Sequence, residues 1–528
     1  MLKTIGLIAL LLTQPSGKPA GEPSLKAPKP PPTKVSKEVS TKSSAQPQGE
    51  APFQSLTLTD YQDHIRQLLK APGLAGSTTG LIIKRPGEVE NLFAHNPDLP
   101  LVPASTIKLF TTALALDTLG PDYRFITEVR GKLSADGLRI EGDLFIKGYG
   151  DPWLVPERLW MLGQNLKATG VREITGDIVA DPSFFAGPQN ASGIEQDTSS
   201  KAYMAPAGAL SVGFNAVKIH VRPNRKVGEP ATVYLQPSTP KLLIEGSIKT
   251  VTKGRSSYSI EIHPRGDANV VTLSGVIRAD QKPHQLWRRI TNPAVHAAAI
   301  FRDLLNETGV KVIGTSRKGV TPDELPLLTH IESPRLADLV SKVNKFSNNF
   351  MASQLYRTVG AHVYGAPGSS TKGQKALQRF LKSHLDLSPE SYTVNNASGL
   401  HDVNRVSPAQ VIKLLEHFNN APRLRIEYLN SLAVSGGTGT LDDRMTEERS
   451  HGLIRAKTGT LAIASALSGY AFNPQGELLL FSIITNHYKH GIQAVLNMQN
   501  QLGEFLTSRS IRTLPPPIAA NGESSKED

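Results

Sequence analysis

The stretch "LVPASTIKLFTTALALDTLG", residues 101–120, combines a serine–lysine pair with a long apolar run. It begins with a serine and a lysine three positions apart, Ser105 and Lys108, and then becomes almost wholly apolar. The apolar run predicts a buried helix over 104–120, and the spacing places both polar side chains on one helix face. Serine is a poor nucleophile until a base takes its proton, and a buried lysine can be that base. Taken alone, the pair is better explained by a helix cap beside a solvated lysine.

Composition restricts the class of protein. With 528 residues the chain predicts two or three domains. Of its net charge of +12, residues 1–52 contribute +4 and residues 514–528 contribute −2, so the middle carries about +10. We find no dense Lys/Arg run and no nucleic-acid motif, which favours work near an anionic polymer or surface over nucleic-acid binding. The absence of cysteine excludes a thiol nucleophile, disulfides and thiolate metal sites.

Both ends of the chain differ from its middle. Lys3 precedes the apolar run 5–12, and residues 1–13 resemble a short secretory signal that is too short to span a bilayer. A frayed apolar start or a misassigned start codon is the alternative. Residues 14–52 are rich in Pro, Lys and Ser and predict a disordered spacer, and 514–528 predict a loose tail. We therefore expect an exported protein.

The middle of the chain predicts an α/β (α+β) fold with an antiparallel sheet flanked by helices. Residues 53–123 and 327–513 are expected to form one domain, interrupted by a β-rich insertion at 124–326. No internal repeat is evident at solenoid periods. Helices are expected at 57–72, 104–120, 156–168, 292–308, 334–345, 350–362, 371–384, 407–419, 423–432 and 490–507, and two late strands at 453–472 and 477–488.

Two further motifs change the weight of the first one. S-x-x-K alone is weak, since it also occurs at Ser238 and Ser369 without an apolar helix behind it. "KFSNNF" adds Ser347 and Asn349 between two expected helices, and "RAKTGTLA" adds a single K-T-G that begins at Lys457. The order S-x-x-K, S-x-N, K-T-G is the set found in penicillin-recognising serine enzymes. Three motifs in this order are a strong signal, although each alone is explained by a cap, a turn or a strand glycine.

The residue types divide the chemistry of acyl transfer among themselves. Ser105 is the candidate nucleophile and Lys108 its base. Ser347 can pass a proton to the leaving amine, and Asn349 can hold the substrate amide while it contacts the lysine base. Lys457 supplies a cation that keeps the base neutral and attracts an anion.

The K-T-G strand is expected to bind substrate. The hydroxyls of Thr458 and Thr460 can bind a terminal carboxylate, and Gly459 lets the substrate backbone approach the strand. Backbone N–H groups of Ser105 and Thr460 would form an oxyanion hole, where one donor is usually worth about 10²–10³ in rate.

These motifs resemble the D-alanyl-D-alanine carboxypeptidase/endopeptidase family, the class C low-molecular-mass penicillin-binding proteins. The resemblance covers about 55–510 and includes "GDLFIKGYGDPWL", "YMAPAGALSVGFN", "SGLHDVNRVSP" and "GGTGTLDDRM". It implies a serine β-lactamase/DD-peptidase transpeptidase-like domain with two nested insertions, acting on peptidoglycan stem peptides or cross-links outside the cytoplasm. The first inserted domain would comprise 124–200 and 291–326, and the second, β-rich one 201–290. The resemblance also implies an acyl-enzyme on Ser105, acylation by β-lactam antibiotics, and no cofactor or metal.

Some residues depart from the family pattern, and some functions compete with it. Asn396 and Ala397 stand where Asp-Gly is expected, His401 where Ser is usual, and Ser353 where an acid is expected. A serine β-lactamase and a non-catalytic wall-binding protein with the same fold are the alternatives. The intact motif residues argue against the second. The diamino acid of the peptide and the oligomeric state are not predicted.

Overall fold

A computed structural model describes residues 55–190, 199–473 and 475–511 of the chain. The expected signal (1–13), spacer (14–52) and tail (514–528) lie outside the described residues. Within the described part, no helix combines the length and the apolar character needed to cross a membrane.

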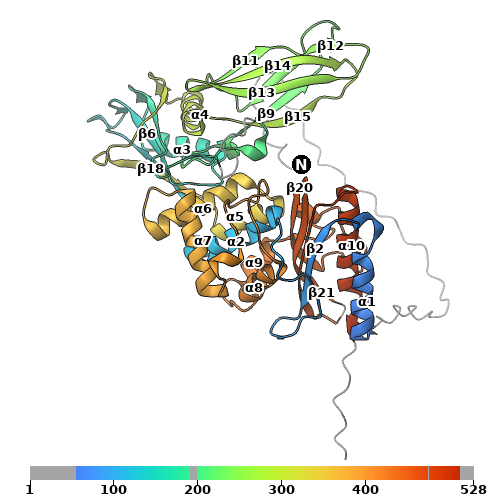
Figure 1. The fold of residues 1–528 in the computed structure, drawn as a ribbon. Helices are drawn as coiled ribbons and strands as arrows, with labels where there is room; N and C mark the ends of the chain where they lie inside the picture. Colours follow the sequence, from blue (N-terminus) through green and yellow to red (C-terminus); the bar gives the residue numbers. More distant parts are fainter. Residues whose placement is uncertain (1–54, 191–198, 474, 512–528) are drawn as a thin grey trace, which may run out of the picture. The chain divides into compact units, whose positions relative to one another are not determined.

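One part of the fold is built on a six-stranded sheet in which every neighbouring pair is antiparallel. The predicted α/β class is confirmed, with helices on both faces of this sheet (Figure 1). In spatial order the strands are β19 (Ala433–Val434), β20 (Ile454–Leu461), β21 (Ala464–Phe472), β22 (Leu478–Asn486), β2 (Thr78–Lys84) and β3 (Phe93–His95).

The central strands are apolar throughout because both faces of the sheet are covered. In β2, Leu81 and Ile83 join one core while Ile82 joins the other, as the two-residue period of a strand requires. The first core contains side chains of α1 (Leu58–Leu69) and α10 (Ile492–Ser508). The second core is formed by α2 (Lys108–Leu119), α5 (Leu336–Phe346), α6 (Asn349–Tyr364), α7 (Ser370–Leu385) and α8 (Pro408–Asn419), with α9 (Arg425–Ser431) beside them.

The expectation of a single strand over 453–472 is wrong. The chain reverses after Leu461, and β20 and β21 pair from Ile454↔Ala471 to Leu461↔Ala464. Ala462 and Ile463 make the turn. The reversal was missed because neither residue is a Gly, Pro, Asn or Asp, the usual signals of a tight turn.

The interrupting part contains a five-stranded sheet in the order β17-β8-β6-β4-β18. Its strands are β4 (Ile126–Arg130), β6 (Leu144–Gly148), β8 (Ile178–Asp181), β17 (Ser316–Lys318) and β18 (Leu327–Glu332), and it packs with α3 (Pro156–Ala168) and α4 (Pro293–Glu307). Since β18 pairs with β4, we place the return to the six-stranded part after residue 332 rather than at 327.

Three corners beside this sheet repeat one pattern that was not noticed in the sequence. Gly-Asp at 142–143, Gly-Asp at 176–177 and Gly-Thr at 314–315 each join a two-residue strand to a strand of the five-stranded sheet. Successive copies stack in parallel. The short strands are β5 (Arg139–Ile140), β7 (Glu173–Ile174) and β16 (Lys311–Val312). The nested insert separates the second copy from the third, so the repeat has no constant period along the chain.

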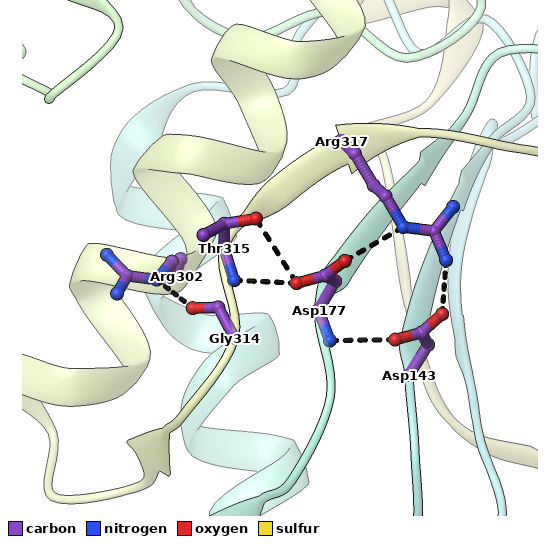
Figure 2. Close-up of polar contacts among 6 residues, drawn as sticks. All are labelled: Asp143, Asp177, Arg302, Gly314, Thr315 and Arg317. Carbon is purple, nitrogen blue, oxygen red and sulfur yellow. Dashed lines mark hydrogen bonds and ion pairs between the residues drawn. The ribbon is translucent and has the colours of Figure 1, made fainter.

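A ladder of hydrogen bonds holds these corners together (Figure 2). Asp143 Oδ1 accepts from the backbone N–H of Asp177 at 2.8 Å, and Asp177 Oδ1 accepts from that of Thr315 at 2.7 Å. The backbone bond from Thr315, together with Arg317, holds the pKa of the Asp177 carboxyl below its usual value, and the Arg317 guanidinium bridges both aspartates. A Cβ on Gly176 would lie 2.4 Å from the backbone of the preceding corner, so this position needs glycine.

The nested insert is a two-sheet sandwich (Figure 1). One sheet has the order β10-β9-β15, and the other contains β11, β14 and β12, with β13 also paired to β14. Apolar side chains of the two sheets form a core of their own. The strands are β9 (Ala216–Arg222), β10 (Thr232–Gln236), β11 (Leu242–Gly246), β12 (Lys249–Val251), β13 (Ser257–Arg265), β14 (Ala268–Arg278) and β15 (His284–Arg289).

Candidate active site

Ser105 lies in a 3₁₀ turn (Ala104–Ile107) that leads directly into α2. Ala104 has φ 48°, in the left-handed region that an alanine rarely adopts, so the turn must be held by its neighbours. Two glycines, Gly399 and Gly459 of β20, pack closely against this turn. A Cβ on Gly399 would lie 1.9 Å from the carbonyl oxygen of Ala104, and one on Gly459 would lie 3.0 Å from the nitrogen of Ser105. The serine is therefore fixed by close backbone packing on both sides.

Lys108 is fully buried, and its Nζ contacts three oxygens. It lies 2.9 Å from Ser105 Oγ, 2.7 Å from Asn349 Oδ1 and 2.5 Å from the carbonyl oxygen of Ser398. Burial, followed by the positive charge of Lys457, lowers the pKa of Lys108 well below its ordinary value. The neutral form of the lysine, with two N–H bonds and one lone pair, is therefore easier to reach than in an ordinary lysine.

The three contacts fix where that lone pair points. The amide oxygen of Asn349 and the carbonyl oxygen of Ser398 can only accept hydrogen bonds, so each must receive an N–H from Lys108. Ser105 Oγ is the one neighbour of the three that carries a proton to give. In the neutral form of the lysine, the lone pair therefore faces the serine hydroxyl, which is the geometry of a general base.

Ser347 and Lys457 form a second serine–lysine pair. Lys457 Nζ donates to Ser347 Oγ at 2.9 Å and to the carbonyl oxygen of Thr458 at 2.7 Å. Ser347 follows the last residue of α5 and lies in the left-handed region, with φ 57°. Burial lowers the pKa of Lys457 to about 7. Two buried lysines thus line one pocket, and the charge of Lys457 makes Lys108 easier to deprotonate.

Asn349 connects the pocket to the nested insert. It is the first residue of α6, whose N-cap Asn348 accepts from the backbone of Met351. Its Nδ2 donates to the carbonyl oxygen of Tyr203 at 3.1 Å. This bond fixes the amide with Oδ1 toward Lys108, because only the nitrogen end can donate to a carbonyl.

The K-T-G strand presents an open edge to this pocket. On one side β20 pairs with β21 over its whole length, but β19 pairs only with Arg455 and Ala456 on the other. Ile454 directs its N–H and C=O toward the β19 side, to Ser435. By the two-residue period of a strand, Thr458 and Thr460 direct theirs to the same edge, beyond the end of β19. Their backbone groups are placed to bind an extended chain.

The expected substrate residues of this strand differ in their surroundings. Thr460 is exposed, and Thr458 Oγ1 donates to Thr440 Oγ1 at 2.7 Å. Gly459 faces a neighbour that the sequence did not suggest: its missing Cβ would lie 2.6 Å from the carbonyl oxygen of Pro103. The glycine thus allows β20 to approach the turn that holds the nucleophile.

The other two S-x-x-K motifs take no part in this pocket. Ser369 caps α7 by accepting from the backbone of Lys372, whose Nζ donates to the carbonyl oxygens of Gly365 and Pro367. Ser238 lies between β10 and β11 of the nested insert. Capping explains the copy at Ser369, whereas Ser105 faces a buried lysine.

Sequence reasoning missed the two carbonyl groups that orient the pocket, those of Ser398 and Tyr203. Both residues lie in the quoted family motifs, "SGLHDVNRVSP" and "YMAPAGALSVGFN", but a backbone carbonyl leaves no residue-type signature. Asn396, one of the departures, shapes the first of these segments. Its Oδ1 accepts from the N–H of Gly399 at 2.8 Å, and its Nδ2 donates to the carbonyl oxygen of Leu400 at 2.9 Å. A carboxylate could make the first bond but not the second.

Among residues 55–190, 199–473 and 475–511, no group of three or more His, Cys, Asp or Glu is arranged to hold a metal ion. The chemistry of the pocket is that of two serine–lysine pairs, an amide and a strand edge.

Comparisons with known proteins agree with this geometry. Residues 61–509 match the model of the D-Ala-D-Ala carboxypeptidase 3 (S13) family. The D-alanyl-D-alanine carboxypeptidase of Actinomadura sp. (strain R39) is 32% identical over 488 residues, covering 88% of this chain and 89% of that protein. The D-alanyl-D-alanine carboxypeptidase DacB of Haemophilus influenzae is 26% identical, covering 81% of this chain and 92% of its own length.

Solved structures with the same fold include two of one penicillin-binding protein. Penicillin binding protein 4 (dacB) of Haemophilus influenzae aligns with a TM-score of 0.73 at 25% identity, covering 83% of this chain and 98% of that one. A second structure of that protein, complexed with a β-lactam, aligns with a TM-score of 0.69 at 24% identity, covering 84% and 99%. The family match spans most of the chain and includes both serine–lysine pairs. The chain therefore belongs to the D-Ala-D-Ala carboxypeptidase 3 (S13) family of serine hydrolases.

Proposed function

We propose that Ser105 attacks the carbonyl carbon of the penultimate D-alanine in a peptide ending in D-Ala-D-Ala. Lys108 takes the hydroxyl proton as the Oγ–C bond forms. The single observation that carries this assignment is the set of three oxygens around Lys108 Nζ. Two of them, Asn349 Oδ1 and the carbonyl oxygen of Ser398, can only accept hydrogen bonds. Collapse of the tetrahedral intermediate releases the terminal amino acid and leaves an acyl-enzyme, which water then hydrolyses.

The leaving amine needs a proton, and Ser347 is placed to give it. Its Oγ accepts from Lys457, so a proton lost to the amine can be replaced from that ammonium. Lys457 also supplies the positive charge that attracts the terminal carboxylate of the substrate. Asn349 keeps the base oriented from the opposite side.

The peptide would bind as an added strand along the open edge of β20. The backbone groups of Thr458 and Thr460 would pair with it, and their hydroxyls would reach the terminal carboxylate. The N–H groups of Ser105 and Thr460 would stabilise the oxyanion, worth about 10²–10³ in rate for one donor. The closeness of Gly459 to the nitrogen of Ser105 supports this pairing of donors.

The natural substrate we propose is the stem peptide or cross-link of peptidoglycan, met outside the cytoplasm after export. β-Lactams would acylate the same serine; the Haemophilus influenzae relative has been solved with one bound. A labelled penicillin separates the alternatives. Durable labelling at one equivalent supports the peptidase, turnover without accumulation supports a β-lactamase, and no labelling supports a non-catalytic wall-binding protein.

The chain contains its own matched control for the base. Lys108→Ala is expected to slow acylation by about 10²–10⁴, the usual worth of a positioned acid–base group. Lys372→Ala removes the lysine of another S-x-x-K motif and is expected to acylate at the parent rate. If Lys108→Ala labels as fast as the parent, Lys108 is not the base.

A further inference from the structure

Positive charge in this protein is concentrated in the nested insert. Residues 201–290 contain fourteen Lys and Arg against five Asp and Glu, a net charge of +9 out of +12 for the whole chain. This segment supplies none of the side chains of the candidate active site. Its charge therefore requires a separate explanation, and an anionic polymer is the natural complement.

One face of the β10-β9-β15 sheet points away from the core of the insert. Along β9, Val217, Ile219 and Val221 point into the sandwich, and the alternate residues Lys218 and His220 point out. Tyr234 on β10 is 57% exposed and Trp287 on β15 is 40% exposed. Large aromatic rings are usually buried, so two exposed on one sheet face indicate a ligand that stacks on them.

The strand register arranges these side chains in two rows across the sheet. Tyr234 and Gln285 both pair with His220, and Gln236 and Trp287 both pair with Lys218. The rings of Tyr234 and His220 are 5.7 Å apart, and Lys218 Nζ lies 5.5 Å from the Trp287 ring. His220 is also bonded to Gln236 at 3.0 Å. Each row thus combines an aromatic ring, a basic side chain and a side-chain amide.

The aromatic rings suit the apolar faces of pyranose rings, and the amides and imidazole suit their hydroxyl and N-acetyl groups. The lysine suits the carboxylates of the attached peptides. We propose that this face of the β10-β9-β15 sheet, called here the platform, binds the glycan strand of the wall polymer on which the substrate peptides are carried. This inference rests on the proposed peptidase function and adds a second, non-catalytic binding site to it.

The platform is joined to the active site by one short segment. Lys201 forms an isolated bridge with Arg288 at the edge of β15. Two residues further on, the carbonyl oxygen of Tyr203 accepts from Asn349 Nδ2. A glycan strand held on the platform would thus be bound beside the segment that touches the catalytic asparagine.

The test is co-sedimentation of the full chain with purified sacculi, and binding to glycan strands freed of their peptides. The double variant Trp287→Ala with Tyr234→Ala is expected to raise the Kd for sacculi and for peptide-free glycan strands about tenfold, because two aromatic anchors are lost. Trp160→Ala is the matched control, because Trp160 is 46% exposed but lies on α3. All variants should keep the parent rate of penicillin acylation, since none of these side chains contributes to the pocket.

Hydrolysis provides a second readout. The double variant should lose activity on insoluble sacculi but keep kcat/KM for a short soluble D-Ala-D-Ala peptide. Parent-like sedimentation by the double variant would overturn the proposal. So would binding to sacculi with none to peptide-free strands, or tighter binding to single-stranded oligonucleotides than to glycan. A parent that fails to label with penicillin would instead contradict the proposed function, so the two failures are distinguishable.

Charge is tested separately. Lys218→Gln should weaken binding to sacculi more than Lys249→Gln, which removes an exposed lysine from the other sheet of the same insert. Equal effects of the two variants would show that net charge alone, and not the platform, holds the polymer.

Discussion

Adding one methyl group to the protein, by Gly459→Ala, is expected to slow acylation of Ser105 about a hundredfold. The new Cβ would lie 2.6 Å from the carbonyl oxygen of Pro103 and 3.0 Å from the nitrogen of Ser105. Ordinary contacts are about 3.5 Å, so β20 and the turn before α2 must separate by about 0.9 Å. A misplacement of about 1 Å at a reacting group can cost about 10²-fold in rate. The forced separation should also lower the free energy of unfolding by about 1–3 kcal/mol.

The measurement is the rate of acylation by a fluorescent penicillin, beside kcat and KM for a D-Ala-D-Ala peptide and thermal unfolding. Gly437→Ala is the matched control. A Cβ there would meet only ordinary contacts, the nearest at 3.5 Å from the Val434 side chain. The control should keep the parent rate and stability.

Two results would refute this reasoning in different ways. Parent-like acylation and stability of Gly459→Ala would show that the contact with Pro103 places no constraint on the turn. A rise in KM for the peptide alone, with unchanged stability and penicillin acylation, would return the glycine to the role expected from the sequence, close approach of substrate.

Three further predictions follow from the charges of the site and of the corner ladder. In the proposed mechanism Lys108 acts neutral and Lys457 charged. The kcat/KM should therefore rise with pH as Lys108 loses its proton and fall above about pH 7 as Lys457 loses its own, measured as a pH–rate profile. Asn349→Asp places a carboxylate beside Lys108, so the pKa of the lysine rises and the ascending limb should move at least about one pH unit upward. Arg317→Gln removes the exposed guanidinium that forms ion pairs with Asp143 and Asp177. It should lower the free energy of unfolding by roughly 1 kcal/mol, as thermal unfolding would show, without changing the rate of penicillin acylation.

The fold was predictable where one physical rule governs a long segment. The apolar runs around 81–83 and 478–484 must be buried on both faces, and the helix behind Ser105 has no polar face to expose. The corner ladder was not predictable in the same way. Each corner is only two residues, and the second and third copies are separated by the nested insert. Short motifs at unequal spacing lack the periodicity on which sequence patterns depend.

The grouping of the side chains in the candidate site was predictable, because three motifs with a common chemistry occur in a fixed order, while their catalytic roles stay proposals. The orientation of these side chains was not predictable. The carbonyl groups of Ser398 and Tyr203 select the direction of the Lys108 lone pair and of the Asn349 amide. Any residue type could provide such a carbonyl, so only the folded backbone identifies which ones do.

The Tyr203 carbonyl links the nested insert to the candidate base through Asn349. Without that acceptor, the Asn349 amide could turn and present Nδ2 to Lys108. A neutral lysine facing an N–H donor would accept from it, and its lone pair would no longer point at Ser105 Oγ. The hydrogen bond of 3.1 Å from Asn349 to the nested insert therefore keeps the N–H groups of Asn349 away from the Lys108 lone pair. By this reasoning the insert acts on the chemistry through one carbonyl, and on the polymer through the platform.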